Sequence, residues 1–299
     1  MSQNVIEIAH LSKYYGTKCA LNDLTLNIPD NAISAIVGAN GAGKSTLFQI
    51  LLGILKPSAG QASVLGCDSR SLTSAIRGLV GFVNEEHSLP DWLSIGQLAK
   101  MQQKAYPQWQ EDVYQHIIGN FNVSPSQIIG SLSRGERAGV NLSMAMAQQP
   151  KLLLLDEPTL GLDVVAKRAF LESLMFSQEN CDSAIVYCSH ALDEIERLAE
   201  HLIIIERGKL RNHSTLEDFV SRVQCWKVQF NGKTPNNNVI PGLLQSSKVD
   251  NFHLYTVLDQ TDDYASVLQS LGAEKIHSVP VNLVSAVSDF LSKNHAAHH

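Results

Sequence analysis

One segment of the sequence combines glycines, a lysine and hydroxyl groups at a spacing that suits phosphate binding. Residues 38–46 read Gly-Ala-Asn-Gly-Ala-Gly-Lys-Ser-Thr, which fits the pattern G-x-x-x-x-G-K-[ST]. Glycines let backbone N–H groups wrap around phosphates, and the N-terminus of the following helix adds partial positive charge. We therefore predict a nucleotide site whose phosphate-binding residues are Gly38, Asn40, Gly41, Gly43, Lys44, Ser45 and Thr46.

Two side chains of this segment have separate tasks in that chemistry. Lys44 would supply a positive charge to the β- and γ-phosphates, and Ser45 would offer a hydroxyl to Mg²⁺. We expect Lys44 to face solvent, so that its replacement would leave the fold intact.

A second segment supplies the acidic groups that such a site needs. The apolar run 152–155 ends in Asp156 and Glu157. Asp156 would serve Mg²⁺, and Glu157 would polarise the attacking water. Taken alone, the same stretch would fit a buried strand that ends in a solvated acidic pair. The phosphate-binding pattern favours the catalytic interpretation.

The elements that must position these residues follow an alternating order. The apolar runs 32–37, 152–155, 184–188 and 202–205 predict buried strands, and period-two spacing predicts another strand over 20–28. Helical patterns are expected over 47–55, over two or three short segments within 91–130, and from Ser133 to the residue before Pro150. Strands that alternate with helices predict an α/β fold.

The pattern changes after about residue 220. A polar, turn-rich stretch lies between the strand-like segments 225–230 and 252–258, and segments 264–271 and 283–291 look helical. We predict two domains, with the nucleotide chemistry in residues 1–220 and a small α/β extension in residues 221–299.

The residues between the two chemical segments carry a specific resemblance. Residues 132–136 read Leu-Ser-Arg-Gly-Glu just before the acidic strand, and residues 161–163 read Gly-Leu-Asp just after it. This order resembles that of the ATP-binding subunits of ABC transporters, whose LSGGQ-type signature precedes the acidic strand. The resemblance covers about residues 3–215. It implies a P-loop ABC ATPase core with an antiparallel β subdomain and a helical subdomain at about residues 91–150.

The resemblance also implies roles for single residues. Tyr15 resembles the aromatic residue that stacks on adenine, with Tyr14 as the neighbouring candidate. His190 matches the histidine that senses the γ-phosphate, and would act in catalysis with Glu157 and Lys44. The further nucleotide-binding residues that the resemblance implies are Ser133, Gly135, Glu136 and Asp163. In this family two copies sandwich ATP head to tail, so the signature of one copy would meet the nucleotide on the other.

Three residues depart from the family pattern. Glu85 stands where the family has glutamine; because a carboxylate can ligate Mg²⁺, Glu85 joins Ser45 and Asp156 as an expected metal ligand. Arg134 replaces the first signature glycine, and Glu136 replaces the final glutamine. We expect retained activity with altered metal dependence, and a changed strength of ATP binding in the dimer.

Composition argues against several other classes of protein. The 299 residues include 23 Lys and Arg against 29 Asp and Glu, a formal charge of −6, which disfavours a binder of duplex nucleic acid. No apolar stretch approaches the roughly 20 residues that span a bilayer, and residues 1–10 lack a signal-peptide pattern. The five cysteines form no CxxC pair, which predicts reduced thiols and a cytoplasmic protein.

The predicted function is an ATPase with ATP and Mg²⁺ as cofactors. The resemblance implies a homodimer that drives a separate multi-span permease at the inner face of the cell membrane, with no nucleic-acid partner. The stretch around Trp109 and the C-terminal extension resemble those of export-type subunits for drugs, antibiotic peptides and polysaccharides. Substrate contacts normally belong to the permease, so no transported substrate is predicted.

Two alternatives remain at this point. A soluble ABC ATPase that acts on ribosomes or DNA is disfavoured by the single cassette and by the lack of long heptad repeats. A nucleotide-gated regulatory module that hydrolyses ATP poorly is favoured by the departures at Glu85, Arg134 and Glu136. The intact Lys44 and Glu157 count against it.

Overall fold

The chain forms two compact units in the computed structural model, which describes residues 4–231 and 234–296; for residues 179–180 and 293–296 only the backbone is described. The units divide between His213 and Ser214. This division comes earlier than the boundary predicted after residue 220, because helix α8 (Leu216–Ser221) packs within the second unit. There Phe219 meets Phe290 of helix α10 (Leu283–Ala296) edge to face at 5.5 Å.

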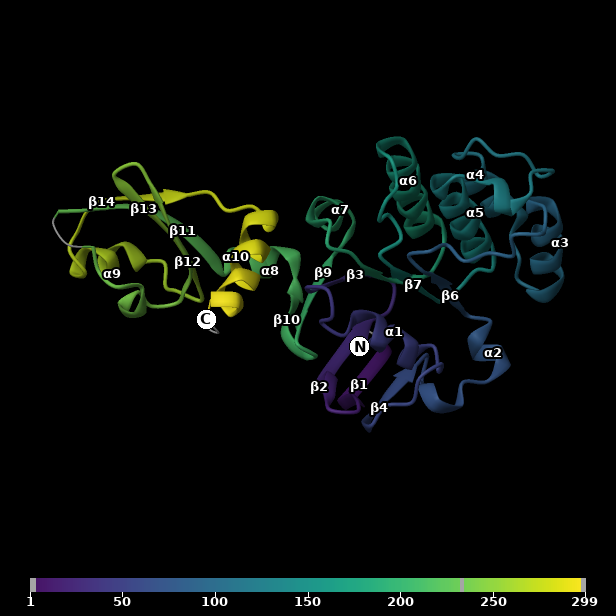
Figure 1. Ribbon diagram of the computed structural model, residues 1–299, viewed down its shortest axis with the longest axis horizontal. Coiled ribbons are helices and arrows are strands. Elements are labelled where there is room, and N and C mark those ends of the chain that lie inside the picture. Colours follow the sequence, from purple (N-terminus) through teal and green to yellow (C-terminus); the bar gives the residue numbers. More distant parts are fainter. Residues whose placement is uncertain (1–3, 232–233, 297–299) are drawn as a thin grey trace. The chain divides into compact units, whose positions relative to one another are not determined.

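The first unit begins with an antiparallel sheet (Figure 1). Its strand order is β2 (Lys18–Pro29), β1 (Asn4–Tyr15), β4 (Ala59–Val64) and β5 (Cys67–Asp68). The predicted alternation is present in β2, where Leu24, Leu26 and Ile28 are buried and the residues between them are exposed. Because side chains of a strand alternate between faces, one face of β2 supplies the core that also holds helix α1 (Lys44–Leu51).

A second sheet of six strands forms the centre of this unit. Its order is β10 (Lys209–Thr215), β9 (His201–Glu206), β3 (Ile33–Val37), β8 (Ala184–Cys188), β7 (Leu152–Asp156) and β6 (Val80–Val83). The four strand pairs from β9 to β6 are all parallel. Every residue of β3 and β8 is buried, as expected for parallel strands covered on both faces. The carboxyl ends of β3, β6, β7 and β8 therefore meet at one edge, which is where a ligand binds in such sheets.

Helices complete the first unit. In chain order they are α1, α2 (Ser74–Arg77), α3 (Ile95–Ala105), α4 (Glu111–Ile118), α5 (Arg134–Ala147), α6 (Val164–Asn180) and α7 (Leu192–Leu198), with single 3-10 turns at Ser69–Ser71 and Ile129–Ser131. The predicted helix over 47–55 ends at Leu51, because Gly53 takes a left-handed φ of 69°. Helices α3, α4 and α5 share their own apolar core around Leu98, Tyr114 and Met144.

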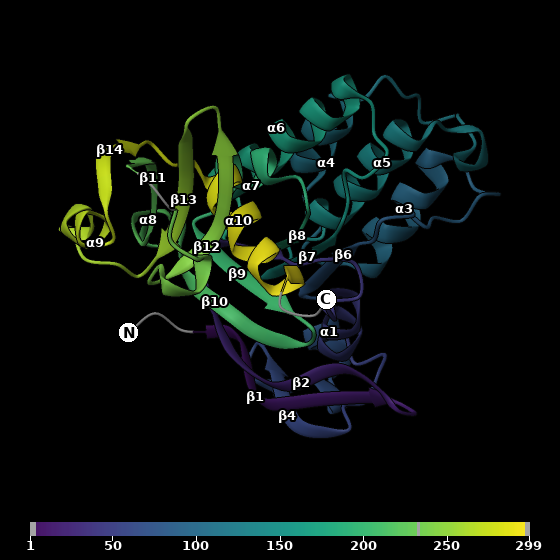
Figure 2. The same cartoon turned by 60° about the vertical axis from the view of Figure 1, so that its left-hand side comes forward.

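The second unit is a four-stranded antiparallel sheet with helices (Figure 2). Its order is β12 (Leu243–Val249), β13 (Phe252–Leu258), β11 (Val223–Phe230) and β14 (Ala273–Val279); α9 (Tyr264–Ser270) and a 3-10 turn (Asn237–Val239) complete it with α8 and α10. Tyr255 and Tyr264 lie in its core. Among the described helices of the whole chain, none combines the length and apolarity needed to cross a bilayer.

Candidate functional site

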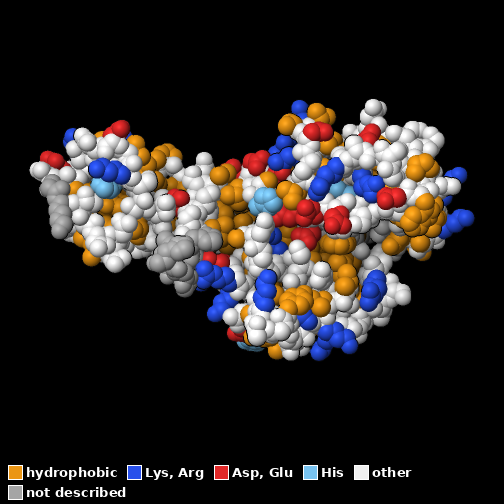
Figure 3. Space-filling view, in the orientation of Figure 1, with side chains coloured by type: hydrophobic (Ala, Val, Ile, Leu, Met, Phe, Trp, Pro, Cys, Tyr) orange, Lys and Arg blue, Asp and Glu red, His pale blue; other side chains and the backbone are white. Residues whose placement is uncertain are grey.

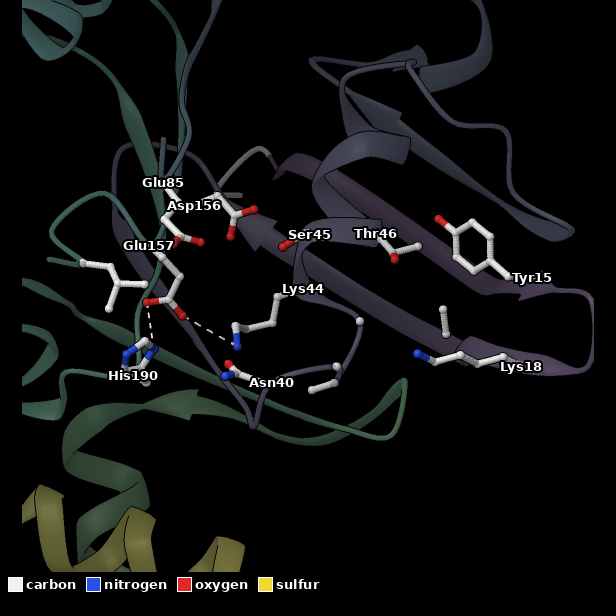
Figure 4. Close-up of a pocket in the computed structure, with 15 residues that line it drawn as sticks. Tyr15, Lys18, Asn40, Lys44, Ser45, Thr46, Glu85, Asp156, Glu157 and His190 are labelled. Atoms are coloured by element: carbon white, nitrogen blue, oxygen red, sulfur yellow. Dashed lines mark ion pairs between the residues drawn. The ribbon is translucent and has the colours of Figure 1, made fainter. Parts of the chain in front are cut away.

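A cavity of about 440 Å³ opens at the edge where the parallel strands end (Figure 4). The predicted residues that it brings together are Tyr15, Asn40, Gly41, Gly43, Lys44, Ser45, Thr46, Glu85, Asp156, Glu157 and His190. Figure 4 shows the acidic side chains and His190 at one end and Tyr15 at the other, with Lys44 and Ser45 between them. Of the two neighbouring tyrosines, Tyr15 is the one in the lining.

The loop from β3 to α1 depends on glycines for two different reasons. Gly43, directly before α1, has a φ of 109°, which a side-chain-bearing residue rarely adopts, and a Cβ there would lie 2.5 Å from the carbonyl oxygen of Ala20. A Cβ on Gly38 would lie 2.2 Å from the carbonyl oxygen of Ile205. Gly38 thus permits close packing against β9, whereas Gly43 permits the turn that brings the N-terminus of α1 to the cavity.

Lys44 is buried, so the expectation that it faces solvent is wrong. Its side chain is 7% exposed, and its Nζ donates a hydrogen bond to the Gly38 carbonyl at 2.6 Å. The same Nζ lies 3.7 Å from Oε1 of Glu157. An ammonium removed from water needs such partners, and Glu157, directly after β7, provides one.

The carboxylate of Glu157 lies between the side chains of His190 and Lys44. Its Oε2 lies 2.9 Å from Nδ1 of His190, whose side chain is 51% exposed, while its Oε1 faces Lys44. The backbone of Glu157 has a left-handed φ of 49°, and its N–H donates to the Cys188 carbonyl at 2.9 Å. Strained backbone of this kind gathers at functional sites. The geometry gives Glu157 a fixed position from which its carboxylate can orient a water molecule.

The residues at the acidic end suit a hard divalent cation. Oδ1 of Asp156 is buried and has no hydrogen-bond partner among the described residues. Burial raises the pKa of Asp156 and is the main cause of its shift; the charges of Glu157 and Glu85 also raise it, whereas the Ser45 hydroxyl and the charge of Lys44 lower it. Figure 3 shows acidic side chains gathered in the middle of the first unit. Carboxylate and hydroxyl oxygens are the ligands that Mg²⁺ prefers, so Ser45, Asp156 and Glu85 fit this metal.

The signature residues lie outside this cavity. Ser133 precedes α5 and accepts a hydrogen bond from the N–H of Glu136 at 3.3 Å, while Oε2 of Glu136 accepts one from the N–H of Ser133 at 2.8 Å. This reciprocal pair is a capping box. Glu136 therefore caps the helix as a glutamine at this position would. This shared role explains why the fold accepts glutamate in place of the family's glutamine.

The other two residues, Asp163 and Gly135, lie at the start of helix α6. Asp163 caps α6 by accepting a hydrogen bond from the N–H of Ala166 at 2.8 Å. A Cβ on Gly135 would lie 2.5 Å from the Cβ of Ala166, so a glycine is needed for this contact. Ser133, Gly135, Glu136 and Asp163 thus form a second surface, separate from the lining of the cavity.

Two functional features escaped sequence reasoning. Lys18 lines the cavity beside Tyr15, with which it pairs across the β1–β2 hairpin. The Gly-Thr turn between the two residues was the signal in the sequence that could have identified this pair.

The second feature is the buried carboxylate of Glu194, which is 1% exposed. It accepts hydrogen bonds from Lys167 at 2.6 Å, from Thr159 at 2.8 Å, and from the Tyr187 hydroxyl. This buried carboxylate ties the loop after β7 to the end of β8, and no motif announces it.

His87, fully buried, anchors the loop that follows β6. Its Nε2 lies 2.8 Å from the Pro158 carbonyl, to which a neutral ring can donate a hydrogen bond. The pKa of His87 is lowered to about 4: burial is the main cause, the charges of Arg134 and Arg137 act in the same direction, and the hydrogen bond to the Pro158 carbonyl opposes them. As the pH falls, the unfolded chain therefore protonates His87 before the folded chain does. The contribution of neutral His87 to the free energy of unfolding is lost between about pH 6.5 and about pH 4.

We expect this loss to reach about 2–3 kcal/mol by about pH 4. His87→Gln keeps a side-chain N–H for the Pro158 carbonyl but cannot titrate. Urea unfolding of both proteins at about pH 7 and about pH 4 would measure the difference. Carboxylates contribute equally to both proteins, so an equal loss of stability in wild type and His87→Gln would contradict the assignment.

Comparison with known proteins gives a consistent result. A family model described as ABC transporter matches residues 21–160. The molybdenum import ATP-binding protein ModC of Escherichia coli is 30% identical over 280 residues, which cover 89% of this chain and 72% of that protein. The Nod factor export ATP-binding protein I of Rhizobium johnstonii is 29% identical over 248 residues, covering 79% and 77%.

Solved structures share the fold. An ATP-binding subunit of an ABC transporter matches with a TM-score of 0.64 at 25% identity, covering 73% of this chain and 92% of that one. A dimeric ATP-binding cassette bound to ADP and phosphate matches with a TM-score of 0.63 at 21% identity, covering 70% and 98%. The second likeness concerns the fold alone.

Proposed function

This chain belongs to the family of ABC transporter ATP-binding subunits, and from that premise we propose that it binds and hydrolyses Mg²⁺-ATP to drive a membrane permease. The observation that carries the proposal is the convergence of Lys44, Asp156, Glu157 and His190 on one cavity from the ends of β3, β7 and β8 and the segments that follow them. A poorly hydrolysing regulatory module would not require Glu157 to be held between a lysine and a histidine.

In the proposed mechanism, each residue has a task set by its position. The adenine lies against Tyr15, and the phosphates lie over the N-terminus of α1. Lys44 turns from Glu157 to the phosphates, which frees the carboxylate to orient the attacking water. His190 holds the other oxygen of Glu157 and senses the γ-phosphate. Mg²⁺ held by Ser45, Asp156 and Glu85 would offset the negative charge of the phosphates.

We propose that two copies complete each other's sites. The surface that carries Ser133, Gly135 and Asp163 lies apart from the cavity in this chain. In a head-to-tail dimer it would reach the γ-phosphate on the partner, with the backbone N–H groups at the start of α5 directed at it. The ATP-binding cassette of the same fold that was solved with ADP and phosphate is itself dimeric.

The proposed membrane partner is a multi-span permease, which would hold the chain at the inner face of the cell membrane. Trp92 and Met101 expose 78% and 58% of their surface in the helical region, and large exposed apolar side chains favour a protein partner there. The relatives include an import and an export subunit, so the expected export direction stays a prediction. We assign the ATPase to the first unit and leave the second unit as an appendage.

The experiment that tests the ATPase is Lys44→Ala. Loss of the ammonium removes the charge that faces the phosphates, so we expect ATP hydrolysis at background level in the presence of Mg²⁺. Because Lys44 is buried against the Gly38 carbonyl, the melting temperature must be measured as well. Lys209→Ala, at an exposed position of β10, is the matched control. Wild-type hydrolysis by a folded Lys44→Ala protein would refute the proposal.

A further inference from the structure

Two of the three departures from the family pattern, Arg134 and Glu85, contact each other. Nη2 of Arg134 donates a hydrogen bond to the backbone carbonyl of Glu85 at 3.0 Å and lies 3.8 Å from Oε1 of the Glu85 side chain. Arg134 begins α5, whereas Glu85 follows β6, so the contact joins the signature to the loop that carries an expected metal ligand. The glutamine and glycine that the family has at positions 85 and 134 carry no charge, so no ion pair would join them.

Glu85 adds negative charge to a cavity that already has an excess of it. Asp156 and Glu157 line the same cavity, and Lys44 is the cation closest to them. The phosphates of ATP are themselves anionic, so an uncompensated carboxylate at position 85 opposes their binding unless a cation is close.

Arg134 is held where it can supply that cation. Its guanidinium lies over Gly161, where a Cβ would come within 3.3 Å of Cζ. The planar guanidinium has several donors in a fixed geometry, so one Arg134 side chain reaches both the backbone carbonyl and the carboxylate of Glu85. The Arg134 side chain is 45% exposed, so its ion pair with Glu85 contributes little to the stability of the fold.

We propose that Arg134 is a positioning residue for Glu85: it offsets the charge of this carboxylate and holds its loop, so that a glutamate can replace glutamine beside the phosphates. This inference rests on the proposed Mg²⁺-ATP site. When Mg²⁺ is present, the metal offsets the same carboxylate. Arg134 is therefore needed most when the nucleotide arrives without its metal.

The test is a double-mutant cycle read by nucleotide binding. Wild type, Arg134→Ala, Glu85→Gln and the double variant are titrated with a fluorescent ATP analogue, once in EDTA and once in Mg²⁺. We expect Arg134→Ala to weaken binding in EDTA by about threefold, the size of an exposed ion pair. The same substitution in the Glu85→Gln background should have a smaller effect, because only the hydrogen bond to the backbone carbonyl of residue 85 is then lost, and Mg²⁺ should suppress the defect.

The control is Arg137→Ala, which removes the same charge from the same helix. Arg137 instead pairs with Asp91 at 2.8 Å and donates a hydrogen bond to the Ile129 carbonyl at 3.1 Å. An equal effect of Arg134→Ala in both backgrounds, or the same pattern for Arg137→Ala, would overturn the inference. Failure of the wild type to bind the analogue in Mg²⁺ would instead refute the proposed function, so the two failures are distinguishable.

Discussion

Glu157→Gln should lower ATP hydrolysis by about 10²–10⁴-fold while ATP binding persists, which is the usual contribution of a general base. The amide keeps the shape of the side chain and a hydrogen-bonding group for His190, 2.9 Å away. It loses the negative charge that would orient the attacking water. Glu157→Gln should also remove the repulsion between the carboxylate and the γ-phosphate. The variant should therefore accumulate as an ATP-bound dimer on size exclusion.

A matched control for this variant is Glu196→Gln, an isosteric change on the exposed face of α7. It should hydrolyse ATP at the wild-type rate. Steady-state phosphate release and size exclusion with ATP would be measured on the three proteins. Normal turnover by Glu157→Gln would exclude Glu157 as the base, and His190 would then be the next candidate.

Mixing two inactive variants should restore part of the activity, because each site is built from two chains in the proposed dimer. Lys44→Ala spoils the phosphate loop, and Ser133→Asp places a negative charge against the γ-phosphate. Aspartate is chosen because Ser133 caps α5, and aspartate is also a good N-cap. Each homodimer has two spoiled sites. In the heterodimer both lesions fall on one site, and the other site is intact.

The matched control puts both substitutions in one chain and pairs it with a wild-type chain. This heterodimer contains the same two lesions, but each falls on a different site, so it should stay inactive. Hydrolysis is measured on heterodimers purified through two different tags. Equal activity in the two arrangements would contradict a shared site. If neither is active, trapping of ATP at the intact site of the first heterodimer distinguishes coupled sites from unshared ones.

Local pattern was sufficient for the parts of the site that are continuous in sequence. Residues 38–46 contain the turn, the charge and the start of the helix together, so their spacing alone predicts phosphate binding. The run 152–157 likewise predicts a buried strand that ends in carboxylates, and β7 confirms the strand. Apolar β-branched runs predicted β3 and β8 for the same reason, since burial on both faces imposes continuous hydrophobicity.

Tertiary structure decided every feature that joins distant residues. Sequence placed Lys44 in solvent, but the fold buries its ammonium against the Gly38 carbonyl and near Glu157, which directly follows β7. Glu85 and Arg134 were separate departures in the sequence, and the packing of α5 brings them into contact. Such pairings depend on loop geometry and helix orientation over long separations, which periodicity and motif spacing do not encode. The sequence by itself therefore determined which chemical groups this protein carries, and the packing of its strands and helices decided which of those groups meet.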